Sequence, residues 1–172
     1  TESELEELGV WDHPVVRRYQ KEIRQGRHVV EALRPGVQLN SLEGFLNVDD
    51  LAVLRVQDDD GEKLVERLLR TFRQIGKPYD FNFSVETTNR IVCSELVYQT
   101  VTDIDWPTQQ QFGRSTISPD HVVRTLLSQK DMEIVVLYHD GVEVEKDRLA
   151  LLRELLAARR EQGYKLYGQD PE

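Results

Sequence analysis

The sequence has a single cysteine, Cys93, among its 172 residues. One thiol cannot close a disulfide within the chain, and it cannot supply a zinc site built from several thiolates. A lone thiol is compatible with a reducing or an oxidising compartment, so the cytoplasm and the periplasm both stay open. The motifs of P-loop, dinucleotide-binding, zinc-peptidase and serine-hydrolase sites are also missing. The sequence therefore implies no metal and no organic cofactor.

Long apolar runs and an excess of positive charge are missing as well. No run approaches the roughly 20 apolar residues that span a bilayer, so no transmembrane segment is expected, and no signal-like segment opens the chain. The 31 acidic residues outnumber the 22 basic ones and give a net charge of −9. Nucleic acids and anionic membranes attract basic surfaces, so neither is expected to be the main partner. The oligomeric state stays open.

The length and the hydrophobic pattern predict one α+β domain over residues 1–172, ending in a polar tail over 163–172. Hydrophobic spacing and capping residues predict helices over 1–8, 14–23, 64–72, 91–101, 122–127 and 149–158. Short β-branched or apolar runs predict strands over 28–33, 51–56 and 133–138, which we expect to form one small antiparallel sheet. The polar stretches 79–90 and 105–118 are expected to be loops, the second long enough to line a cleft.

Cys93 lies where the loop over 79–90 gives way to a helix. A thiol in the first helical turn faces unpaired N–H groups and the positive end of the helix dipole, and both favour the thiolate. The alternative is a small, buried hydrophobic side chain. Ser94 and Glu95 follow in the same turn, where a hydroxyl or a carboxylate suits the free N–H groups, so we assign them structural roles.

Three segments together carry a family resemblance. Residues 76–83 read GKPYDFNF, residues 93–97 read CSELV, and residues 29–37 contain VVEA followed by Gly36-Val37. This pattern resembles the YiiX-type branch of the NlpC-like, circularly permuted papain-fold cysteine hydrolases, and it is best matched over residues 27–100. In these bacterial proteins a G-x-x-Y-D-x-x-F segment precedes a C-S-E-L-V helix whose cysteine is the nucleophile. The resemblance implies a permuted papain-like fold in which a small antiparallel sheet packs against the helix of Cys93.

The resemblance also implies a thiol-dependent hydrolase or acyltransferase that acts on an amide or ester. Peptide, cell-wall and lipid acyl substrates all occur among relatives, and nothing in the sequence chooses between them. Cys93 would attack the carbonyl, a histidine would act as base and then as acid, and Glu31 matches the polar residue that orients this histidine. Tyr79 would help to stabilise the oxyanion. The alternatives are a solvated strand carboxylate for Glu31 and a packed aromatic side chain for Tyr79.

The catalytic histidine is the difficult assignment. The family places it on a strand before the Glu-Ala pair, but His13 lies in Asp12-His13-Pro14, and a proline removes a hydrogen-bond donor from a strand. His28 has an odd separation from Glu31, which puts the two side chains on opposite faces of one strand. We therefore expect the true base to lie before Thr1, in an N-terminal histidine-bearing segment that this chain lacks, with His13 as the fallback. A catalytically inactive binding module of the same fold, or a structural domain with a packed Cys93, remains the alternative.

Overall fold

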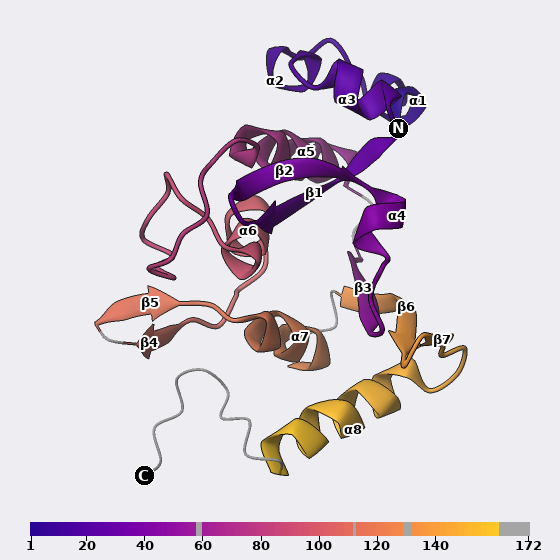
Figure 1. Ribbon diagram of the computed structural model, residues 1–172, viewed down its shortest axis with the longest axis vertical. Coiled ribbons are helices and arrows are strands. Elements are labelled where there is room, and N and C mark those ends of the chain that lie inside the picture. Colours follow the sequence, from indigo (N-terminus) through magenta and orange to yellow (C-terminus); the bar gives the residue numbers. More distant parts are fainter. Residues whose placement is uncertain (58–59, 112, 129–131, 162–172) are drawn as a thin grey trace. The chain divides into compact units, whose positions relative to one another are not determined.

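The computed structural model describes residues 1–57, 60–111, 113–128 and 132–161. The expected polar tail over 163–172 lies outside these residues. Contacts divide the chain into two units, each described by itself below. Unit 1 comprises Thr1–Leu46 and Asp59–Asp105, and unit 2 comprises Asn47–Asp58 and Trp106–Glu172. Both combine helices with short antiparallel strands, which confirms the α+β class (Figure 1).

Three short helices open unit 1: α1 (Glu2–Glu7), α2 (Pro14–Arg17) and α3 (Gln20–Arg24). The single helix expected over 14–23 is wrong, because Tyr19 leaves helical geometry with φ −117° and ψ 7°. Its ring lies 6.0 Å from that of Phe72, and its hydroxyl donates to the carbonyl of Ile75 at 3.3 Å. These tertiary contacts override the local helix preference, as they commonly do.

Helix α5 (Gly61–Gln74) is the longest helix among the described residues of unit 1. Asp60 caps it, since its carboxylate accepts from the N–H groups of Glu62 and Lys63 at 3.0 and 3.3 Å. Apolar side chains of α1 to α3 pack with α5 and the following hairpin to bury one core. Its buried members are Leu5, Val10, Trp11, Val16, Ile23, Leu39 and Phe72.

Strands β1 (Arg27–Leu33) and β2 (Gly36–Ser41) form an antiparallel hairpin in unit 1, followed by α4 (Leu42–Phe45). The expectation that 28–33 shares a sheet with 51–56 and 133–138 is wrong, because β1 pairs with β2 and the other two strands pair with each other. The Pro35-Gly36 turn returns the chain at once, so the next segment becomes the partner of β1. Helix α6 (Cys93–Thr100) packs on this hairpin through a second core of Ala32, Val37, Ile91 and Leu96.

The segment after α5 pairs with the start of the hairpin's second strand. Val37 N–H donates to the carbonyl of Lys77 at 2.9 Å, and Gly76 N–H donates to that of Val37 at 2.8 Å. A Cβ atom on Gly36 would lie 2.2 Å from the Lys77 carbonyl oxygen. The close approach of these two backbones therefore requires glycine at position 36.

Replacing Gly36 with alanine is expected to destabilise unit 1 by about 2–4 kcal/mol, because the added methyl group meets a main-chain oxygen that no rotamer change can move. Urea unfolding of G36A and of the wild-type protein measures this difference. Gly61→Ala is the matched control, because a Cβ atom there has nothing within 4 Å. Equal stability losses for G36A and G61A would contradict the clash.

The described residues of unit 2 form two small sheets and two helices. Strands β3 (Leu51–Val56), β6 (Met132–His139) and β7 (Val142–Glu143) form one antiparallel sheet in the order β3-β6-β7. The loop expected over 105–118 is wrong in part, because β4 (Gln109–Gln111) and β5 (Arg114–Thr116) form a hairpin inside it. The helices are α7 (Pro119–Ser128) and α8 (Arg148–Glu161). Among the described residues, no helix combines the length and the apolar character needed to cross a membrane.

Candidate active site

Cys93 is the first residue of α6, an eight-residue helix. Val92 before it is extended, with φ −99° and ψ 171°, and both Ile91 and Val92 are buried. Leu96, one turn further on, packs against the β1–β2 hairpin, so the start of the helix is fixed on both sides of the cysteine. The Cys93 side chain itself is exposed, so it is not the small core side chain that the packed alternative requires.

Tyr79 lies on a segment held between the hairpin and the approach to Cys93. Its N–H donates to the carbonyl of Pro35 at 2.9 Å, and it forms a parallel bridge with Ile91, two residues before the cysteine. Partial burial and the nearby Cys93 raise the pKa of Tyr79, while Arg34 opposes this shift. The phenol therefore keeps its proton at neutral pH and remains a hydrogen-bond donor within electrostatic reach of the sulfur.

An aromatic side chain and a cation lie next to Tyr79. The Phe81 ring lies edge-on to that of Tyr79, with centroids 5.3 Å apart and an interplanar angle of 60°. The guanidinium carbon of Arg34, at the tip of the β1–β2 hairpin, lies 5.1 Å from the Phe81 centroid. Neither residue could be identified as part of a site from the sequence, because a loop phenylalanine and a turn arginine have no local signal that distinguishes them.

Glu31 lies on the face of the hairpin that points away from α6. Successive side chains of a strand alternate between its faces, and the neighbouring Ala32 is buried against Ile91 and Leu96. Glu31 instead pairs across the hairpin with Gln38, and it accepts a hydrogen bond from the Asn40 amide at 2.5 Å. The structure thus places Glu31 and Cys93 on different faces of this sheet, and the orienting role of Glu31 gains no support from it.

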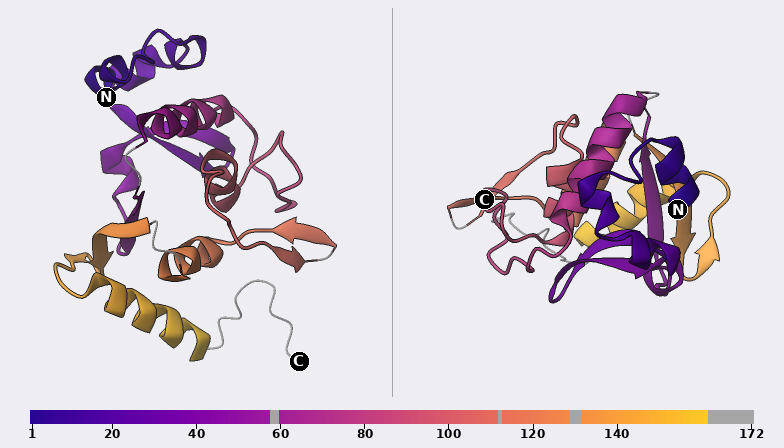
Figure 2. Two further views of the ribbon diagram at one scale, coloured as in Figure 1. Left: turned by 180° about the vertical axis from the view of Figure 1, so that it is seen from behind. Right: turned by 90° about the horizontal axis from the view of Figure 1, so that it is seen from above.

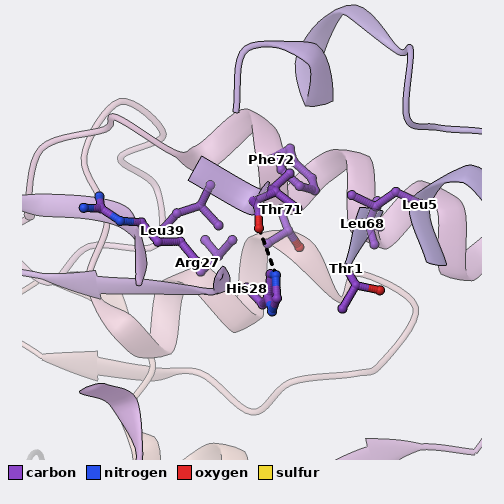
Figure 3. A pocket seen from close by; sticks show the side chains of 10 residues that line it. Thr1, Leu5, Arg27, His28, Leu39, Leu68, Thr71 and Phe72 are labelled. Atoms are coloured by element: carbon purple, nitrogen blue, oxygen red, sulfur yellow. Dashed lines mark hydrogen bonds between the residues drawn. The ribbon is translucent and has the colours of Figure 1, made fainter. Parts of the chain in front are cut away.

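The two imidazoles of unit 1 have local partners elsewhere. His13 caps α2, where its Nδ1 accepts from the Val15 N–H at 3.3 Å. Helix α2 lies beyond α5 and the β1–β2 hairpin as seen from α6 (Figures 1 and 2). His28 lines a largely apolar cavity of about 260 Å³, with Nε2 3.0 Å from the Ile23 carbonyl oxygen (Figure 3). Neither side chain is brought next to Cys93, so His13 gains no support as the general base.

The sequence of this chain matches a known protein family over most of its length. The model of permuted papain-like amidase enzymes, YaeF/YiiX, C92 family, matches residues 3–157. The chain belongs to the C92 family. This membership confirms the expected resemblance and the permuted papain-like fold, and it supports a cysteine hydrolase-type activity in general. Comparisons with curated proteins and with solved structures gave no significant match.

Glu95 is the residue at this C92 family site whose environment is most unusual. It is fully buried, as is the neighbouring carboxyl of Asp80. One carboxylate oxygen of Glu95 accepts from the Val92 N–H at 3.0 Å, and the other has no hydrogen-bond partner among the described residues. Burial, together with the charge of Asp80, raises the pKa of Glu95 to about 7, although the Val92 N–H opposes the shift.

The helical period explains why Glu95 is buried when Cys93 is exposed. Two residues along an α-helix correspond to roughly 200°, so the two side chains point in opposite directions. Glu95 therefore does not face the sulfur. Its carboxylate instead binds the backbone N–H of Val92, the residue before Cys93. The structural role expected for Glu95 in the first helical turn agrees with this contact, whereas the burial of its carboxyl was not expected from the sequence.

Proposed function

We propose that this protein is a thiol-dependent hydrolase or acyltransferase whose nucleophile is Cys93. The observation that carries the proposal is the exposed sulfur at the start of α6, in a chain of the permuted papain-like amidase family. A thiol in this position meets free N–H groups and the positive end of the helix dipole, which favour its reactive thiolate form. The substrate is an amide or ester of the peptide, cell-wall or lipid acyl classes.

In the proposed mechanism the Cys93 thiolate attacks the substrate carbonyl and forms a carbon–sulfur bond. The carbonyl oxygen takes up the negative charge, and the Cys93 N–H together with the Tyr79 hydroxyl donates hydrogen bonds to it. Collapse of this intermediate breaks the bond to the leaving amine or alcohol, which takes a proton from solvent water. Water then hydrolyses the thioester, or a second nucleophile accepts the acyl group.

Alkylation of Cys93 tests whether the thiol is activated. Because the chain has one cysteine, iodoacetamide labelling followed by mass spectrometry reports this thiol alone. At pH 7 we expect the folded protein to react at least about ten-fold faster than the same chain unfolded in denaturant, since only the thiolate is nucleophilic and an ordinary thiol ionises near pH 8.5. A folded protein that reacts no faster than the unfolded chain would contradict the proposal.

A non-catalytic binding module is the second candidate function. It is favoured by the placement of His13 and His28, which leaves Cys93 without an imidazole partner from unit 1. The two candidates differ in turnover. An activated thiol that is acylated once by a chromogenic ester, with no further product release, would favour the binding module, and sustained product release would favour the hydrolase.

A further inference from the structure

Arg34 is an exposed cation that has no ion pair among the described residues. Its guanidinium carbon lies over the face of Phe81, 5.1 Å from the ring centroid. Four other arginines of unit 1 are held by carboxylates, in the pairs Arg17–Asp12, Arg24–Glu2, Arg67–Asp103 and Arg70–Glu66. The remaining ones, Arg18, Arg27, Arg73 and Arg90, also have no ion pair among the described residues, and Arg34 differs from them in lying over an aromatic ring. In a chain with a net charge of −9, an arginine without a carboxylate partner is available to a ligand.

The contact with Phe81 orients this cation. An arginine stacked on an aromatic face loses part of its freedom before any ligand arrives, which lowers the entropic cost of binding. Phe81 is itself 58% exposed, and its ring also contacts the ring of Tyr79. The pair thus presents an apolar surface next to one fixed positive charge.

Backbone pairing joins the segments that carry this pair to the segment that leads into Cys93. Arg34 is followed by Pro35, whose carbonyl accepts from the Tyr79 N–H, and Tyr79 in turn bridges to Ile91 at the approach to α6. The pKa of the Tyr79 hydroxyl responds both to Cys93 and to Arg34. Both the sulfur of Cys93 and the guanidinium of Arg34 are therefore close enough to the Tyr79 hydroxyl to affect its ionisation.

We propose that Arg34, held on Phe81, binds a carboxylate of the substrate while Cys93 attacks the neighbouring carbonyl. The guanidinium offers a planar pair of donors that matches a carboxylate, and Phe81 covers the apolar part of the same group. The substrate class is then an amide or ester with a carboxylate close to the scissile bond. This inference rests on the proposed role of Cys93 as nucleophile.

Two alkylating reagents of similar size test the inference without a known substrate. Iodoacetate carries a carboxylate next to the reacting carbon, and iodoacetamide carries a neutral amide in its place. The measured quantity is the ratio of their rate constants at Cys93, at one fixed pH and low ionic strength. The ratio cancels changes in the thiolate fraction, because both reagents need the same thiolate.

We expect Arg34→Gln to lower the iodoacetate-to-iodoacetamide ratio by about three- to ten-fold, because an attractive charge near the sulfur is removed. Arg34 is exposed, so the variant is expected to fold. Arg18→Gln is the matched control: it removes the same charge from an exposed position after α2 and should leave the ratio unchanged. An unchanged ratio in R34Q, or an equal fall in R18Q, overturns the inference.

The outcomes of the two proposals can be told apart. If folded Cys93 reacts with iodoacetamide no faster than the unfolded chain, the proposed function fails, whatever the ratio. If iodoacetamide reacts rapidly but R34Q leaves the iodoacetate-to-iodoacetamide ratio unchanged, Cys93 is still supported as the nucleophile. The proposal of a carboxylate-bearing substrate is then rejected.

Discussion

Replacing Cys93 with serine is expected to reduce ester and amide hydrolysis by this protein at least about a thousand-fold. A serine hydroxyl has nearly the size of a thiol but is far less acidic, so it yields almost no anion at neutral pH unless a base removes its proton. Cys93 is exposed, and therefore the substitution removes little packing. Initial rates with chromogenic p-nitrophenyl esters and p-nitroanilides measure the loss.

The stability of the variant separates loss of the nucleophile from loss of the fold. Surface substitutions usually change the free energy of unfolding by less than about 0.5 kcal/mol, and C93S should fall in this range by urea unfolding. If C93S keeps more than a tenth of the wild-type rate, Cys93 is not the nucleophile of the reaction. A variant that loses both activity and stability would leave the nucleophile to be judged from the alkylation of the wild-type protein.

The position of Cys93 at a helix start could be predicted because its signals are local. A polar stretch gives way at residue 91 to apolar residues with helical spacing, and the C-S-E-L-V motif marks the same point. The structure begins α6 at Cys93. The turn at Pro35-Gly36 and the end of α5 near Gly76 were predictable for the same reason, since each depends on residue types with restricted or unusual backbone conformations.

The strand partners and the surroundings of the sulfur could not be predicted in this way. The pairing of β1 with β2, and of β3 with β6, depends on which segments meet in space. The face on which Glu31 lies follows from the burial of Ala32 against α6, which is a long-range contact. Arg34 became notable only when the structure placed it on Phe81. Each of these depends on residues far apart in the sequence, where periodicity carries no information.

Glu95→Gln is expected to stabilise the protein at pH 8 by about 2–3 kcal/mol relative to wild type, and to change its stability little at pH 4. The pKa of the Glu95 carboxyl is about 7 in the folded protein, against an ordinary value of 4.5. Between these values the unfolded chain loses the proton while the folded protein keeps it. Stability therefore falls as the pH rises from about 4.5 to about 7, and the cost stays constant above that window.

Glutamine removes this cost because it carries no charge in either state, while its amide oxygen can still accept from the Val92 N–H. Urea unfolding of both proteins at pH 4 and pH 8 measures the change, and Glu62→Gln supplies the control. Glu62 is an exposed carboxylate in the first turn of α5, so its removal should have a small effect at both pH values. An E95Q difference that is the same at pH 4 and pH 8 would show that the buried carboxyl does not titrate as described.

The same variant separates the two contributions of Glu95, the hydrogen bond and the charge. If the bond to Val92 is what fixes the start of α6, E95Q should keep the iodoacetamide rate of Cys93 within about two-fold of wild type, because the acceptor is retained. Glu95→Ala removes the acceptor and leaves the Val92 N–H unpaired in a buried site, so it should lower both stability and the alkylation rate. An alanine variant that alkylates like wild type would mean that the position of the sulfur does not depend on this hydrogen bond.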